Sequence, residues 1–222
     1  DELINLYSNW AQGGAGLLFT GNVMVDHQAM TGPGGVALEA DTPLYRFEQW
    51  AKASKQNNTK VWMQINHPGR QVYAKMKGKV YSSSDVALNM GKMSKLFGKP
   101  SPMTVAQIND VITRFGDTAV KAQKAGFDGV EIHAAHGYLL AQFLSPLVNM
   151  REDEWGGSLE NRARLLIAII KEVKLRVGSN FGIAPASWVA NIQPMFHTDV
   201  NDWGVKLSNS LQINYDDVKE VN

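Results

Sequence analysis

Two kinds of hydrophobic spacing alternate along this chain. Four segments repeat apolar residues every three or four positions, as one face of a helix does; they cover about residues 3–10, 44–51, 108–122 and 159–177. Four short apolar runs lie between or after them and are typical of buried strands; these are 16–20, 60–65, 129–133 and 181–184. Helices that alternate with short strands predict a parallel sheet joined by right-handed crossovers.

Residues that cap helices mark the ends of these segments. Hydroxyl side chains precede three of the helices, and we expect helix starts at Thr42 with Pro43, at Thr104 and at Ser158. Glycines suited to a left-handed cap follow three of them; these are Gly13 with Gly14, Gly126 and Gly178. Residues 71–102 form a long polar stretch after the second strand, which is typical of a functional lid or of disorder.

Two architectures fit this order of elements, a doubly wound sheet and a barrel. The dinucleotide fingerprint G-x-G-x-x-G of the doubly wound class does not occur in the chain. Polar residues gather where the predicted strands end, as on the catalytic face of a barrel. We therefore predict an α/β fold that forms part of a (β/α)8 TIM barrel. The chain has 222 residues, fewer than the roughly 250 typical of a whole barrel.

Composition narrows the function mainly by exclusion. Hydrophobic residues make up 44% and charged residues 19%, as in globular domains, and the formal net charge is +1. That balance gives no reason to expect nucleic acid or an anionic membrane as a partner. The sequence shows neither an apolar run of about 18 residues nor a signal peptide, so we expect a cytoplasmic protein. Without cysteine, disulfides, Cys-ligated zinc and iron–sulfur ligation are excluded for this stretch.

Three histidines directly follow predicted strands: His67, His133 and His136. Any one of them could be a satisfied polar residue, but three at one predicted face favour a function. A metal pair at His133 and His136 is disfavoured, because metal-binding pairs on helices prefer a spacing of four and no companion ligand is evident, so no metal is predicted. The charged run from Arg151 to Arg164 is interpreted as a capped helix start with ion pairs, such as Glu160 with Arg164 four positions on, and not as a site.

Longer motifs make a specific resemblance. The strand end Gln64-Ile-Asn-His-Pro-Gly-Arg70, the stretch from Ala125 through His133-Ala-Ala-His136-Gly-Tyr138, and the following Gln142-Phe-Leu-Ser-Pro146 and Gly156-Gly-Ser-Leu-Glu-Asn-Arg162 runs resemble the old yellow enzyme family. The resemblance covers about residues 1–184. It implies the N-terminal part of an FMN-binding barrel, with the family's first strand and its C-terminal strands outside this chain. Residues 185–222 are divergent, with a displaced fifth strand expected at 205–208.

The resemblance also assigns roles to residues. Gln64 matches the glutamine that binds the pyrimidine edge of FMN, and an amide has the donor and the acceptor for it. Gly21 or Asn22 matches the small residue beside the flavin, although Asn22 is bulkier than the usual alanine. Lys206 matches the basic residue near flavin N1. His133 and His136 match the pair that binds the substrate oxygen, and Tyr138 matches the proton donor.

These roles imply an FMN-dependent oxidoreductase of the ene-reductase type. NADH or NADPH would reduce the flavin, and the substrate would be a small enone-type molecule, an α,β-unsaturated carbonyl compound; a homo-oligomer is left open. Two alternatives remain at this stage. The chain could be a non-catalytic fragment unable to hold FMN, or part of an enoyl- or dienoyl-thioester reductase of the same superfamily, whose iron–sulfur ligands would lie beyond this chain.

Overall fold

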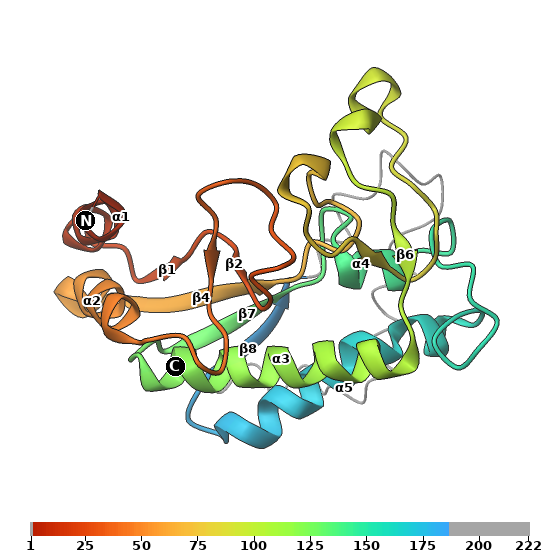
Figure 1. The fold of residues 1–222 in the computed structure, drawn as a ribbon. Helices are drawn as coiled ribbons and strands as arrows, with labels where there is room; N and C mark the ends of the chain where they lie inside the picture. Colours follow the sequence, from red (N-terminus) through yellow and green to blue (C-terminus); the bar gives the residue numbers. More distant parts are fainter. Residues whose placement is uncertain (1, 187–222) are drawn as a thin grey trace.

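A parallel sheet forms the centre of the molecule (Figure 1). The computed structural model describes residues 2–186. In space the strand order is β3 (Val36–Ala37), β2 (Val23–Met24), β4 (Lys60–Asn66), β7 (Gly129–His133) and β8 (Gly182–Ala186), and β1 (Leu17–Phe19) also pairs with β4. Every pairing in this sheet is parallel. The predicted parallel α/β architecture is therefore confirmed for the described residues.

β1 and β2 behave as one interrupted strand. β1 pairs with Lys60–Trp62 at the start of β4, and β2 pairs with Ile65–Asn66 at its end. The sequence predicted only the first half, as residues 16–20. It also missed β3, because a strand of two residues leaves no periodic pattern. The interruption at residues 20–22 places Gly21 and Asn22 beside the middle of β4.

The main helices cover one face of this sheet (Figure 1). They are α1 (Glu2–Gln12), α2 (Tyr45–Ser54), α3 (Val105–Lys124) and α5 (Leu159–Val177). Their apolar stripes pack on the outward side chains of β4 and β7 in one core, whose fully buried members include Met63, Ile65, Phe115, Ile132 and Leu165. Each of these helices alone would expose its stripe, so burial against the sheet drives their docking.

Two of the three expected helix starts are confirmed. The Thr104 hydroxyl accepts from the backbone N–H of Gln107 and forms a capping box, and the Ser158 hydroxyl accepts from the N–H of Asn161. The start at Thr42 is wrong. α2 begins at Tyr45, because the Thr42 hydroxyl accepts instead from the N–H of Glu39 and closes the preceding turn.

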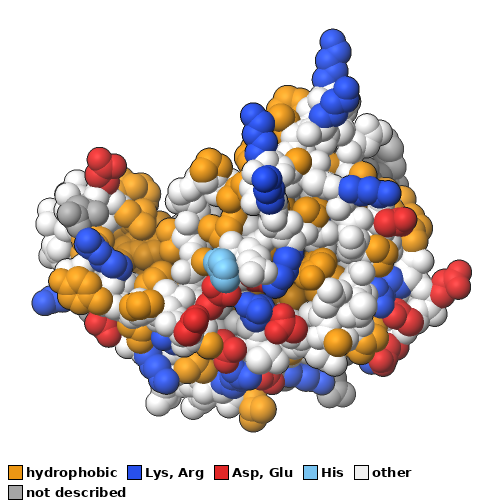
Figure 2. Space-filling model, viewed as in Figure 1, with side chains coloured by type: hydrophobic (Ala, Val, Ile, Leu, Met, Phe, Trp, Pro, Cys, Tyr) orange, Lys and Arg blue, Asp and Glu red, His pale blue; other side chains and the backbone are white. Residues whose placement is uncertain are grey.

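The stretch after β4 is partly ordered by its own pairing. It contains two 3-10 turns, η2 (Ala74–Met76) and η3 (Gly91–Leu96), and the short parallel pair β5 (Tyr81–Ser82) and β6 (Ser101–Pro102). Tyr73 and Phe97 form an isolated bridge, and their rings lie 5.1 Å apart between centroids. This excursion rises above the end of the sheet, and Lys and Arg side chains project from that part of the surface (Figures 1 and 2). The stretch therefore has secondary structure of its own, separate from the main sheet.

The other face of the sheet is only partly covered. Leu17 and Phe19 of β1 are 41% and 42% exposed, and the Phe19 ring lies edge-on to Trp62 at 5.9 Å. The Trp62 indole lies across two glycines of the neighbouring strands: a Cβ placed on Gly129 would be 2.6 Å from the indole, and one placed on Gly182 would be 2.1 Å from it. This face corresponds to the interior of a barrel.

Two sequence predictions concern the chain from residue 184 onward. The boundary expected after residue 184 falls within β8, which runs to Ala186. The strand expected at 205–208, with Lys206, lies outside the described residues. Within the described part, none of the helices has the length and apolar character needed to cross a membrane.

Candidate active site

Two histidines and a tyrosine meet at the carboxyl end of β7. His133 is the last residue of that strand, and its Nε2 lies 3.3 Å from Nδ1 of His136. The Tyr138 ring stands nearly perpendicular to the His133 ring, with 5.0 Å between centroids, and Tyr138 forms the N-cap of α4 (Leu139–Leu144). A strand end followed by a tight turn therefore brings three chemically active side chains into contact.

His133 is neutral at physiological pH. It is 3% exposed, and burial, with a smaller contribution from His136, lowers its pKa from 6.5 to about 4. Its Nδ1 accepts from the N–H of Ala135, at 3.4 Å, which assigns the ring proton to Nε2. The Nε2–H therefore faces Nδ1 of His136 and can donate to it in the absence of another acceptor.

Tyr138 is a protonated phenol whose acidity is set by its neighbours. Burial raises its pKa, a side-chain hydrogen bond from Asn22 lowers it, and the proximity of Tyr73 raises it. Because burial is the largest of these effects, the phenol keeps its proton at neutral pH. The resemblance placed Asn22 beside the flavin, and in the structure its side chain forms a hydrogen bond with Tyr138, the proton-donor candidate.

Gln64 points from the middle of β4 to the interior face of the sheet. Its Nε2 donates to the Glu131 carboxylate at 2.6 Å, which fixes the orientation of the amide. Gly21 is exposed, and its N–H donates to the Tyr7 hydroxyl at 2.9 Å. Glu131 and Tyr7 were not expected from the sequence, although Glu131 is the one charged residue inside an apolar strand, a signal that could have been used.

His67 does not join the other two strand-end histidines. It is 1% exposed, and its Nδ1 accepts from the N–H of Gly69 at 3.1 Å. The charges that influence its pKa belong chiefly to Asp26, Arg114 and Lys79, not to the His133 group. His67 is therefore interpreted as a buried polar residue of the fold, and only His133 and His136 of the three strand-end histidines lie together.

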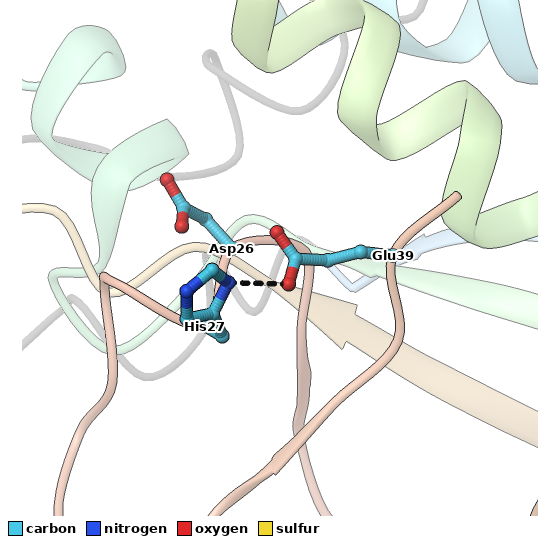
Figure 3. Close-up of side chains that lie close together, drawn as sticks. All are labelled: Asp26, His27 and Glu39. Atoms are coloured by element: carbon cyan, nitrogen blue, oxygen red, sulfur yellow. Dashed lines mark hydrogen bonds and ion pairs between the residues drawn. The ribbon is translucent and has the colours of Figure 1, made fainter. Parts of the chain in front are cut away.

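A second cluster holds a histidine between two carboxylates (Figure 3). His27 Nδ1 lies 2.6 Å from Glu39, with the buried Asp26 beside them. Each carboxylate already has a cation: Lys79 contacts Asp26 at 3.1 Å and Arg114 contacts Glu39 at 2.9 Å. Two positive charges balance two negative charges here, so the cluster is an ion-pair network that ties the loop after β2 to α3.

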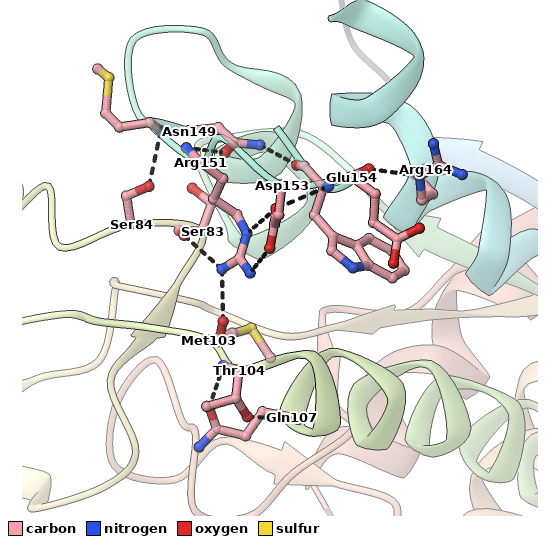
Figure 4. A network of polar contacts seen from close by, with 12 residues as sticks. Ser83, Ser84, Met103, Thr104, Gln107, Asn149, Arg151, Asp153, Glu154 and Arg164 are labelled. Carbon is pink, nitrogen blue, oxygen red and sulfur yellow. Dashed lines mark hydrogen bonds and ion pairs between the residues drawn. The ribbon is translucent and has the colours of Figure 1, made fainter. Parts of the chain in front are cut away.

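The charged run after residue 150 is a structural network as well (Figure 4). Arg151 pairs with Asp153 at 2.5 Å and also donates to the Met103 carbonyl at 2.7 Å, which joins this loop to the end of the excursion. Arg164 donates to the Glu154 carbonyl and to Asn161. The interpretation of this run as a capped helix start is thus confirmed, although Arg164 contacts these groups instead of the Glu160 carboxylate.

The fold and this group of residues define the class, part of a parallel α/β barrel with a polar site at the carboxyl end of a strand. The chain belongs to the NADH:flavin oxidoreductase / NADH oxidase family, whose model matches residues 1–206. Two fungal relatives are NADH-dependent flavin oxidoreductases, iliE of Hypocrea jecorina (strain QM6a) and nadA of Aspergillus parasiticus. They are 39% and 40% identical to it over 81% and 82% of this chain. The chain spans 49% and 43% of their lengths, or about half of each.

Solved structures agree with the partial-barrel assignment. An old yellow enzyme homologue from Zymomonas mobilis matches 83% of this chain with a TM-score of 0.75 at 25% identity, and this match takes 53% of that chain. Old Yellow Enzyme from Pichia sp. AKU4542 matches 83% with a TM-score of 0.74 at 29% identity, over 50% of its chain. A 2-naphthoyl-CoA reductase complex matches 83% with a TM-score of 0.76 at 27% identity, over 29% of its chain.

Proposed function

We propose that this chain belongs to an FMN-dependent NAD(P)H oxidoreductase of the ene-reductase type, which reduces activated C=C bonds of α,β-unsaturated carbonyl compounds. The observation that carries the proposal is the convergence of His133 Nε2 and His136 Nδ1 at 3.3 Å, with the Tyr138 phenol against the same ring. Two ring N–H donors can serve one carbonyl oxygen only if they approach each other in this way.

The residues on the interior face fit a flavin. The Gln64 amide is held by Glu131 through one N–H, which leaves its second N–H and its carbonyl for the alternating donors and acceptors of a pyrimidine edge. The apolar face next to it, with Phe19 and Trp62, suits a planar ring system. Bound FMN would supply hydride transfer from NADH or NADPH to the substrate.

The chain's own residues would handle the oxygen and the proton. Neutral His133 donates from Nε2, and the His136 ring would add a second donor in the tautomer that carries its proton on Nδ1, so both would stabilise negative charge that develops on the substrate oxygen. Tyr138 then gives its phenolic proton to the α-carbon, on which electron density collects. Its half-buried position and raised pKa keep that proton available at neutral pH.

Replacement of Tyr138 by Phe tests the assignment. In the full-length, FMN-loaded protein, Tyr138→Phe should slow the oxidative half-reaction with an enone by about 10²–10⁴-fold, the usual contribution of a general acid. Flavin reduction by NAD(P)H should change little, because no proton from Tyr138 is needed for it. Stopped-flow absorbance separates the two half-reactions. Tyr81→Phe, in β5, is the matched control and should leave both unchanged.

Two results would contradict the proposal. Equal slowing of both half-reactions would remove Tyr138 from the proton-donor role. A purified full-length protein without flavin absorbance would favour the alternative of a non-catalytic protein. Either result is visible before the natural substrate is known, because any simple enone serves as the probe.

A thioester with an anionic tail is the second candidate substrate. Residues 71–102 carry six lysines and one aspartate, and five of the lysines are exposed: Lys75, Lys77, Lys92, Lys95 and Lys99. This charge excess would attract the phosphates of a coenzyme A ester, and the similarity to the 2-naphthoyl-CoA reductase points the same way. A KM for an enoyl-CoA that rises with salt, while the KM for a neutral enone does not, would favour this candidate.

A further inference from the structure

One buried amide connects the loops around the proposed site. The Gln142 side chain, in α4, is 1% exposed. Its Nε2 donates to the Gly137 carbonyl at 2.7 Å and to the Pro68 carbonyl at 3.2 Å, and its Oε1 accepts from the N–H of Arg70 at 3.2 Å. A single side chain therefore binds the turn after β7 and the loop after β4.

That turn has an unfavourable backbone. His136 adopts a left-handed conformation with φ 54°, which is rare for a residue with a side chain, and Gly137 follows with φ 70°. The two successive carbonyls are each held by an amide from elsewhere: Gln71 donates to the His136 carbonyl at 2.8 Å, and Gln142 to that of Gly137. These bonds offset the cost of a conformation that the turn alone would not keep.

The turn decides where the reacting groups lie. Because His136 has this φ, its Nδ1 faces His133 Nε2, and because Gly137 follows, the Tyr138 ring packs against His133. A helical or extended residue at 136 would send the imidazole in another direction. The bond from Gln142 to Gly137 is therefore one residue away from each of two proposed reacting groups.

We propose that Gln142 is a positioning residue for the reaction: its amide locks the turn at 136–137 and thereby aligns the oxygen-binding pair with the proton donor. This inference rests on the proposed function. The Gln142 side chain is buried and bonds to backbone groups of the two loops, so it would act through the turn. Its replacement should therefore affect the oxidative half-reaction, which uses the aligned groups. Small displacements of catalytic groups cost up to about 10²-fold in rate.

Gln142→Met tests the role in the full-length holoenzyme, since methionine has a similar length and removes the three hydrogen bonds. We expect the oxidative half-reaction with an enone to slow by about 10- to 10²-fold and flavin reduction to stay within about twofold. The matched control is Asn149→Leu. Asn149 (Figure 4) is a buried amide too, 5% exposed, and donates to the Phe143 and Trp155 carbonyls, each at 2.8 Å. Neither carbonyl belongs to the turn at 136–137.

A flavin-independent readout accompanies the kinetics. Hydrogen exchange followed by mass spectrometry should rise in residues 136–140 of Gln142→Met and in residues 149–156 of Asn149→Leu. Gln142→Glu provides a partial rescue, because its carbonyl still accepts from Arg70 and its protonated form donates one hydrogen bond to Gly137. Its rate relative to wild type should therefore rise as the pH falls, and that of Asn149→Asp should not.

The outcomes separate this inference from the proposed function. If the wild-type protein fails to react with enones, the proposed function is wrong. If wild type reacts but Gln142→Met slows both half-reactions alike, or slows the oxidative one no more than Asn149→Leu, Gln142 is merely structural and the inference is overturned. If Gln142→Met does not fold, the pair Gln142→Glu and Asn149→Asp gives the same comparison.

Discussion

Protonation of His67 should make the fold markedly less stable in mild acid. Its imidazole is 1% exposed, and its Nε2 has no hydrogen-bond partner among the described residues. Burial is the largest cause of the shift of its pKa from 6.5 to about 4; the negative charge of Asp26 opposes this shift, and the positive charges of Arg114 and Lys79 add to it. Because Nδ1 accepts from the N–H of Gly69, the neutral ring carries its proton on Nε2, and a second proton would have to go to Nδ1. It would displace that hydrogen bond and place a charge on a fully buried ring.

The size of the effect follows from the two pKa values. The unfolded chain binds a proton at His67 below pH 6.5, but the folded chain does so only below about pH 4. Between these values the unfolded state binds more protons, so the free energy of unfolding falls as the pH falls, by about 1.4 kcal/mol for each pH unit. His67 alone should therefore remove about 3 kcal/mol between pH 7 and pH 4.

His67→Asn isolates this contribution, because the Asn side-chain oxygen can still accept from Gly69 but does not titrate. Urea unfolding followed by far-UV circular dichroism gives the free energy of unfolding at each pH. We expect the wild-type curve to drop by about 3 kcal/mol more than the variant curve between pH 7 and pH 4, with the two parallel above pH 7. Parallel curves over the whole range would show that His67 is not a buried neutral imidazole.

Two further predictions concern the site and its packing. His133→Ala and His136→Ala should each weaken binding of a phenol, which mimics an enolate oxygen, by about 2.7–4 kcal/mol, and the double variant should lose less than the sum because both donors serve one oxygen. Titration of the charge-transfer band of the holoenzyme measures the phenol affinity. Unchanged affinity in both single variants would rule out the oxygen-binding role. Gly69→Ala should lower the free energy of unfolding by more than Gly34→Ala, because both glycines have positive φ, but only at Gly69 would a Cβ meet a side chain, 2.7 Å from the Gln142 amide carbon. Equal losses in urea unfolding would mean that backbone strain alone matters.

The main elements could be predicted because their patterns are long enough to count. β4 and β7 were found at nearly their observed bounds, and α3 and α5 begin where their hydroxyl caps predict. Strands of two residues, such as β2 and β3, carry no periodicity and owe their pairing to neighbours. The start of α2 was misjudged because a hydroxyl can satisfy a turn as well as a helix end.

The site divides in the same way. His133, His136 and Tyr138 lie within six residues, so a local motif could indicate them. Gln142 and Gln71 act across 72 and 65 positions of sequence, on Arg70 and the His136 carbonyl, and no local pattern reports such contacts. The sequence also did not indicate which strand-end histidine joins the site. His67 and His133 both lie at strand ends, but only the structure shows that His133 faces another histidine.

The Trp62 indole constrains how this part of the sequence can change in evolution. Its ring occupies the space that side chains on Gly129 and Gly182 would take, on two successive neighbouring strands. A lineage cannot gain a methyl group at either glycine while the tryptophan remains, and a smaller residue at 62 would leave a void over both. The three positions, 62, 129 and 182, are therefore expected to covary among relatives: where residue 62 is small, side chains at 129 and 182 should fill the volume that the indole occupies here.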